Sequence, residues 1–102
     1  MLRMINNKRT EIAELCHRFH VRRLEVFGSA TSGEFDPARS DIDFVVEFDP
    51  DHRIDAFDDY FGLKEELESL FGLAVDLVVE RAMRNPYFRA SVERTREPVY
   101  AT

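Results

Sequence analysis

Hydrophobic positions recur with two different periods along the chain, and the changes of period predict the order of the elements. Apolar residues spaced three and four apart are typical of amphipathic helices, and they predict helices over residues 7–19, 56–71 and 86–96. Short runs of apolar and β-branched residues favour strands, over residues 21–27, 42–48 and 73–79. This order predicts an α/β (α+β) fold, a small mixed β-sheet of about three strands packed with helices.

Local signals mark the ends of these helices. Asn6 or Asn7 suits the N-cap of the first helix, and Gly72 stands where the second should end. Asn85 followed by Pro86 is typical of the start of a helix. Residues 98–100 are expected to form an extended tail.

Length and composition predict one compact domain spanning residues 1–102, with no repeats or linkers. The chain shows no signal-peptide pattern and no run of the ~20 apolar residues that a membrane span needs. Its single cysteine, Cys16, lies on the apolar stripe of the first helix, where packing is the expected role. One cysteine excludes an internal disulfide and fits a reducing cytoplasm, which is the expected location.

The charge distribution bounds the class of ligand. A net charge of −6 argues against binding a DNA duplex, because that binding depends on neutralising phosphates with Lys and Arg. The acids gather in residues 36–59 and the basic residues in 81–96. A small nucleotide stays compatible with this pattern, since a bound cation would cancel part of the negative field.

The chemistry-bearing residues gather in one stretch, residues 24–46. A strand runs into Gly28-Ser29, and a loop containing Gly33 leads to Ser40-Asp41-Ile42-Asp43, which opens the next strand. Side chains two apart on a strand point the same way, so Asp41 and Asp43 are expected ~6.5 Å apart on one face. A Gly-Ser turn after a strand also presents backbone N–H groups to an anion, and Gly33 is expected to take a positive φ.

A third acid, Asp76, lies inside the last predicted strand. An unpaired buried carboxylate costs several kcal/mol, so these acids need a hydrogen bond, an arginine or a hard cation. If the third strand lies beside the second, Asp76 joins Asp41 and Asp43 in a cluster able to hold two magnesium ions ~3.5–4 Å apart. A Gly-Ser turn or an Asp-x-Asp pair alone is commonplace; their combination with Asp76 is far more restrictive.

The segments GSATSG (28–33) and SDIDFVV (40–46), with Asp76 in VDLVV, resemble the signature of the DNA polymerase β-like nucleotidyltransferase superfamily. The short length resembles its smallest members, the minimal nucleotidyltransferases, and the similarity covers nearly the whole chain. The resemblance implies transfer of a nucleoside monophosphate, AMP from ATP, with two Mg²⁺ ions. It assigns metal binding and catalysis to Asp41, Asp43 and Asp76, and nucleotide binding to Gly28, Ser29, Gly33 and Ser40.

One position departs from the family pattern. Many members carry an arginine immediately before the second glycine, where this chain has Ser32. Arg39 is a possible substitute, and its alternative is a solvated loop arginine. Arg81, Arg84 and Arg89 are candidates for the acceptor side of the site, or else form a solvated basic face.

Small relatives of this kind are paired with HEPN ribonuclease toxins, so the resemblance implies an antitoxin that transfers AMP to a tyrosine of such a partner. The alternative from another class is a catalytically weak, nucleotide-binding antitoxin that neutralises its partner by contact alone. A small molecule or an RNA end is a third acceptor class. The chain has more aromatic residues than a small core needs. Core packing is the expected role for most of them, and some are candidates for contact with a partner or with a second copy in a homo-oligomer.

Overall fold

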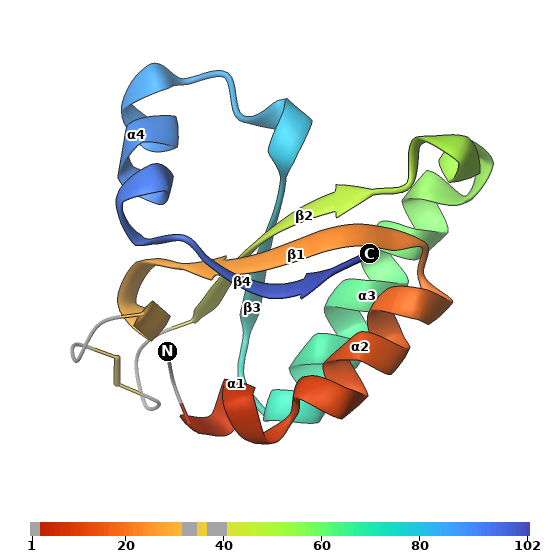
Figure 1. Ribbon diagram of the computed structural model, residues 1–102, viewed down its shortest axis with the longest axis horizontal. Coiled ribbons are helices and arrows are strands. Elements are labelled where there is room, and N and C mark those ends of the chain that lie inside the picture. The colour runs from red at the N-terminus through yellow and green to blue at the C-terminus, as the bar shows by residue number, and fades with distance from the viewer. Residues whose placement is uncertain (1–2, 32–34, 37–40) are drawn as a thin grey trace.

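The computed structural model describes residues 3–31, 35–36 and 41–102, without the side chains of residues 53–55. Its centre is a four-stranded sheet in the order β3-β2-β1-β4 (Figure 1). The strands are β1 (Val21–Phe27), β2 (Ile42–Phe48), β3 (Val75–Val79) and β4 (Glu97–Ala101). β1 pairs antiparallel with both β2 and β4, whereas β2 and β3 are parallel, so the sheet is mixed as the sequence predicts.

Helices cover the two faces of the sheet unequally. The helices are α1 (Arg3–Asn7), α2 (Arg9–Arg18), α3 (Ala56–Phe71) and α4 (Pro86–Thr95). Short 3₁₀ segments connect the elements: η1 (Gly28–Thr31), η2 (Pro50–Asp55) and η3 (Glu80–Ala82). In Figure 1, α1, α2 and α3 lie on one side of the sheet and α4 lies on the other.

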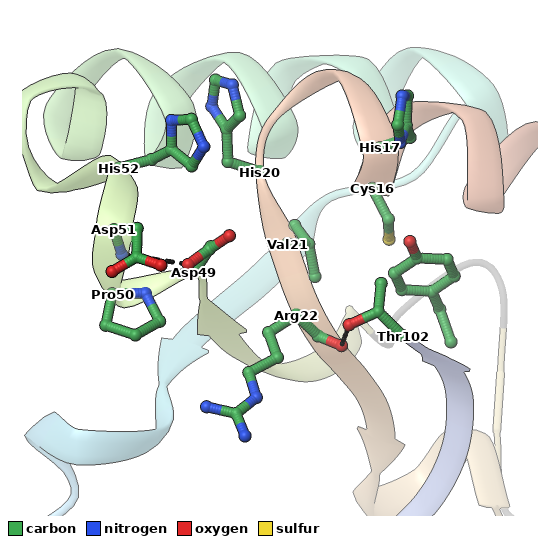
Figure 2. A pocket seen from close by; sticks show the side chains of 11 residues that line it. Cys16, His17, His20, Val21, Arg22, Asp49, Pro50, Asp51, His52 and Thr102 are labelled. Carbon is green, nitrogen blue, oxygen red and sulfur yellow. Dashed lines mark hydrogen bonds between the residues drawn. The ribbon is translucent and has the colours of Figure 1, made fainter.

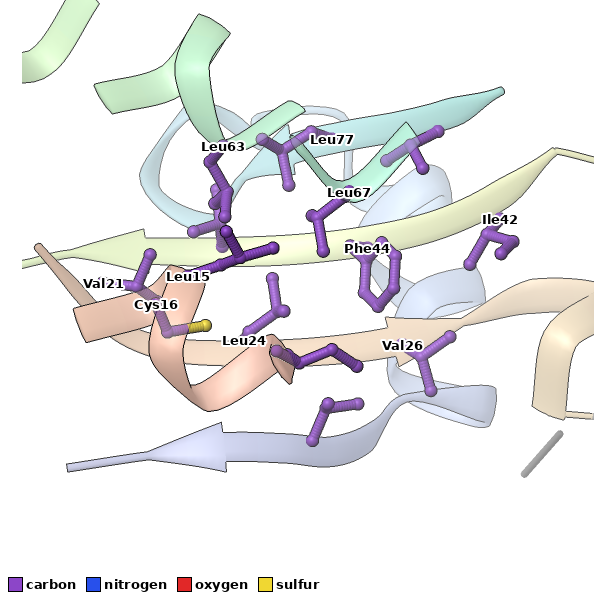
Figure 3. Packing of buried hydrophobic residues seen from close by; sticks show 14 of the residues in the cluster. Leu15, Cys16, Val21, Leu24, Val26, Ile42, Phe44, Leu63, Leu67 and Leu77 are labelled. Atoms are coloured by element: carbon purple, nitrogen blue, oxygen red, sulfur yellow. The ribbon is translucent and has the colours of Figure 1, made fainter. Parts of the chain in front are cut away.

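The larger core lies between the sheet and the first three helices. Alternate strand residues point into it, so Leu24 and Val26 of β1 meet Phe44 of β2 (Figure 3). Leu15 of α2 and Leu67 of α3 close the core from the helical side. Cys16 is fully buried here, which confirms its predicted packing role, and burial raises the pKa of its thiol to about 12.

A smaller core on the opposite face fixes α4. Val92 of α4 packs with Phe27 and Val45, which point to this face of the sheet. Arg96, the residue after α4, is largely buried and ion-pairs with Glu25 of β1 at 2.6 Å and Glu80 of η3 at 2.9 Å. The carboxyl end of α4 is thereby tied to both the sheet and η3.

Most of the predicted boundaries are confirmed. β1, β2 and α3 have the predicted bounds, and Asn85 caps α4 by accepting hydrogen bonds from the backbone N–H groups of Tyr87 and Phe88. Gly72 has φ +66° after α3, as a helix-ending glycine should. β3 is two residues shorter than predicted, and α4 ends one residue earlier.

Two predictions are wrong. Residues 98–100 are part of β4, which adds a fourth strand by pairing with β1, where a tail was expected. The helix predicted over residues 7–19 is α2, and an unpredicted short helix, α1, precedes it; the error lies at the N-cap of α2, where Lys8 stands rather than Asn6 or Asn7. The Lys8 side chain makes no capping hydrogen bond. Over the part of the chain that the structure describes, no helix is long and apolar enough to span a membrane.

Candidate active site

The sheet brings the three predicted carboxylates to one end of one face. β2 and β3 pair in the register that places Asp43 beside Asp76, on strands ~4.8 Å apart. Asp41 precedes the first residue of β2 and is exposed, as is Asp76, whereas Asp43 is partly buried. The expectation that β3 lies beside β2 is confirmed, and the register places Asp76 beside Asp43.

Electrostatics link the three acids to one another. The pKa of Asp43 is raised from 3.8 to about 6, first by burial and then by the negative charges of Asp76 and Asp41. A carboxylate held beside two like charges in a partly desolvated position favours its protonated form. This strand end is therefore a concentrated negative field that a bound cation would relieve.

The turn η1 follows β1 directly and lies against Asp43. Phe27, the last residue of β1, is the register partner of Asp43, so the next residue, Gly28, approaches the same carboxyl group. Gly28 has φ +74°, and a Cβ placed on it would lie 2.8 Å from Oδ2 of Asp43. The positive φ therefore favours glycine, and a Cβ at this position would displace the Asp43 carboxyl group.

The turn is hydrogen-bonded at both of the Gly28 backbone groups. The Gly28 N–H donates to Oγ1 of Thr95 in α4 at 2.9 Å, and the Thr31 hydroxyl donates to the Gly28 carbonyl at 2.8 Å. Ser29, the other predicted phosphate ligand, is partly buried in the same turn. Gly28 thus lies beside the Asp43 carboxyl group, and Ser29 is the next residue of the same turn.

The oxygen ligands of this site suit magnesium, which prefers carboxylates together with water and substrate phosphates. Among the residues that the structure describes, no three carboxylate, His or Cys groups are arranged as a complete metal site. The residues fit the ion in chemistry, and Asp41, Asp43 and Asp76 are the groups that would hold it.

Four residues of the sequence hypothesis lie outside the described part of the chain. They are two nucleotide-binding candidates, Gly33 and Ser40, the departing residue Ser32 and its candidate substitute Arg39. Arg89, one of the acceptor-side candidates, donates hydrogen bonds to the backbone carbonyls of Glu80 and Met83. Its guanidinium therefore holds the connection between β3 and α4.

Sequence reasoning missed the contact between Thr95 and Gly28, because no local pattern signals a bond across 67 positions. It also missed a cavity of about 430 Å³ at the opposite end of the sheet (Figure 2). There Nδ1 of His20 lies 2.9 Å from Oδ2 of the buried Asp59, and the His20 ring stacks on His52. These contacts join the start of β1 to η2 and α3, and we interpret them as structural.

Comparison with known protein families shows which family the chain belongs to. The family model for the nucleotidyltransferase domain matches residues 9–98, which contain the whole sheet except the last residues of β4. The chain belongs to the nucleotidyltransferase domain family. As a nucleotidyltransferase it is an enzyme whose fold, a four-stranded mixed sheet packed with helices, is the one that the sequence motifs imply.

Relatives with known names refine this placement. The chain is 40% identical over 72 residues to the protein adenylyltransferase MntA of Thermococcus cleftensis, covering 71% of this chain and 69% of that protein. It is also 40% identical over 76 residues to MJ1379 of Methanocaldococcus jannaschii, provisionally named a protein adenylyltransferase, covering 74% of each. The nucleotidyltransferase therefore has protein adenylyltransferases among its homologues.

Solved structures agree with the fold. One that is provisionally named a minimal nucleotidyltransferase superposes with a TM-score of 0.73 at 35% identity, covering 91% of this chain and 90% of that one. A MNT antitoxin of Shewanella oneidensis, solved with a tri-AMPylated HEPN toxin, has a TM-score of 0.63 at 22% identity. That match covers 96% of this chain and 73% of the other, and it shows the shared fold.

The geometry of the turn predicts the effect of adding one methyl group. Gly28→Ala should lower the free energy of unfolding by about 1–2 kcal/mol, the cost of a left-handed residue with a side chain, and should displace the Asp43 carboxyl group. Gly72→Ala is the matched control, because Gly72 has φ +66° but open space around its Cβ position. Urea unfolding and transfer assays should show both variants destabilised and only Gly28→Ala inactive. Equal activity of the two variants would contradict the proximity of Gly28 to the Asp43 carboxyl group.

The raised pKa of Asp43 predicts a pH-dependent gain in stability on removing its charge. Between about pH 4 and 6 the folded state binds more protons than the unfolded state, so the free energy of unfolding falls as pH rises. Asp43→Asn should therefore be more stable than the wild type at pH 8 without metal, by about 1 kcal/mol given partial solvent screening, and indistinguishable below pH 4. Urea titrations in EDTA test this, with the exposed Glu65→Gln as control. A stability gap that does not change between pH 4 and pH 8 would contradict the electrostatic cause.

Proposed function

We propose that this nucleotidyltransferase is a magnesium-dependent protein adenylyltransferase that moves AMP from ATP to a tyrosine hydroxyl of a HEPN toxin, and so acts as an antitoxin. The observation that carries the proposal is the grouping of Asp43, Asp76 and Asp41 beside the Gly28 turn, with the pKa of Asp43 raised by burial and by the charges of the other two acids. Such a site combines a cation-binding field with a surface for phosphate.

The names of the relatives support the choice of AMP and of a protein acceptor. MntA of Thermococcus cleftensis is a protein adenylyltransferase, and it is 40% identical to this chain. A toxin–antitoxin structure with AMP-PNP shares the fold with a TM-score of 0.66, and the Shewanella oneidensis complex holds an AMPylated HEPN toxin. We carry the nucleotide and the partner class from these proteins to this chain as part of the proposal.

The reaction needs positioning and charge neutralisation more than covalent participation of the protein. In the proposed step the acceptor oxygen attacks the α-phosphorus, the bond between the α-phosphorus and its bridging oxygen breaks, and pyrophosphate leaves. Magnesium held by Asp41, Asp43 and Asp76 would neutralise the triphosphate charge. Gly28 and Ser29 would hold the β- and γ-phosphates against the end of β1.

Asp76 is the residue that we assign to the acceptor side. It is exposed at the start of β3, whereas Asp43 is partly buried between β1 and β3. An acceptor hydroxyl presented by another protein can reach an exposed carboxylate, which would take its proton as the new O–P bond forms. Asp43, on the central strand, would anchor the nucleotide end of the site. This division would leave the exposed side of the site open to the acceptor protein.

The test is adenylyl transfer to a purified HEPN toxin, with ATP labelled at the α-phosphate and Mg²⁺. We expect label on the partner and, by tandem mass spectrometry, AMP on a tyrosine. Asp76→Asn should lower the rate at least about a hundredfold, the scale of losing one charge-stabilising group. Asp51→Asn, exposed beyond the other end of β2, is the matched control and should transfer normally.

The remaining outcomes separate the alternatives. A tight complex without label on either protein would favour an antitoxin that acts by contact alone. Label on RNA or on a small molecule would contradict the proposed acceptor while keeping the transfer chemistry. Full activity of Asp76→Asn would contradict the assignment of the carboxylates.

A further inference from the structure

The hydrogen bond between Gly28 and Thr95 joins the candidate phosphate turn to a helix remote in sequence. The Gly28 N–H donates to Oγ1 of Thr95 at 2.9 Å across 67 positions. Gly28 begins η1 and Thr95 is the last residue of α4, so the bond ties the carboxyl end of that helix to the site. A glycine with φ +74° has little conformational preference of its own, and an outside contact is needed to fix it.

Thr95 is well placed to be this contact, because the chain around it is anchored. The next residue, Arg96, is largely buried and pairs with Glu25 of β1 and Glu80 of η3. Val92, one turn earlier in α4, is fully buried in the smaller core. The end of α4 therefore moves with the sheet, and the turn takes its position from Thr95.

The position of Gly28 matters because the turn lies beside the metal-binding candidates. A Cβ built on Gly28 would lie 2.8 Å from Oδ2 of Asp43, so the turn faces that carboxyl group. A shift of the turn away from β2 would open the distance between the phosphate-binding atoms and the acids. The Thr95 hydroxyl holds the turn next to the Asp43 carboxyl group.

We propose that Thr95 is a positioning residue for nucleotide binding: its hydroxyl accepts from the Gly28 N–H and fixes the phosphate turn against Asp43. The inference rests on the proposed function and extends it to a residue outside the family signature. It assigns α4 a second role, besides packing, as the rigid support of the turn. In the opposite interpretation, the Thr95 hydroxyl occupies the Gly28 N–H that the nucleotide needs, and its removal would lower KM for ATP.

The test compares Thr95→Val, which keeps the shape and removes the acceptor, with Thr95→Ser, which keeps the hydroxyl. Thr95→Val should raise KM for ATP about tenfold, the value of one buried hydrogen bond, and change kcat less than about threefold. Thr95→Ser should restore KM to within about twofold of wild type. Ser91→Val, at an exposed position of the same helix, is the control for a β-branched substitution and should leave both constants unchanged.

An activity-independent measurement keeps this test separate from that of the proposed function. Amide hydrogen exchange at Gly28, followed by NMR without nucleotide, should quicken in Thr95→Val and stay slow in Thr95→Ser. Unchanged exchange, an unchanged KM, or a lower KM in Thr95→Val would each overturn the inference. Failure of the wild type to transfer AMP, with the exchange result intact, would overturn the proposed function and the nucleotide role while leaving the Gly28–Thr95 contact.

Discussion

The parallel pairing of β2 with β3 is the constraint on which the site depends. It sets Asp43 beside Asp76, and because side chains alternate between faces, both acids point away from the large core. A slip of one residue would turn one acid into that core and break the pair, so the register is fixed by Phe44 and Leu77 on the buried face. The same alternation that builds the core therefore assembles the charge.

The face of the sheet that carries Asp43 and Asp76 also carries Glu25, and its acids form two groups along the strands. At one end, the Arg96 guanidinium donates to the carboxylates of Glu25 and Glu80 and so neutralises them. At the other end, burial and then the charges of Asp76 and Asp41 raise the pKa of Asp43. Within the part of the chain that the structure describes, Glu25 and Glu80 are paired with Arg96 and the site acids form no ion pair, which is the pattern expected where a cation and a substrate complete the site.

The sequence predicts much of this molecule because its strong signals are local. The bounds of β1, β2 and α3 follow from hydrophobic period and end signals, and the pairing of β2 with β3 sets Asp43 beside Asp76. β4 escaped prediction because five residues containing Pro98 carry little periodic signal, and β4 forms only by pairing with a strand far away in sequence.

The sequence also did not predict the contacts between distant segments. The bond from Gly28 to Thr95 and the pair of His20 with Asp59 join residues 67 and 39 positions apart, and neither involves a recognisable motif. Such contacts depend on how elements pack, which residue spacing does not encode. The first contact holds the Gly28 turn and the second holds the corner between α2 and β1. The structure therefore adds most at positions where no sequence pattern predicts a contact.

The most direct test of the carboxylate site is to find where a divalent ion binds. Mn²⁺ titrated into the ¹⁵N-labelled protein broadens amide signals near the bound ion. We expect the broadening to centre on Asp41, Asp43, Asp76 and Gly28, and to disappear in Asp43→Asn. Broadening confined to the His20–His52 end of the sheet, or the same broadening in Asp43→Asn, would contradict this account.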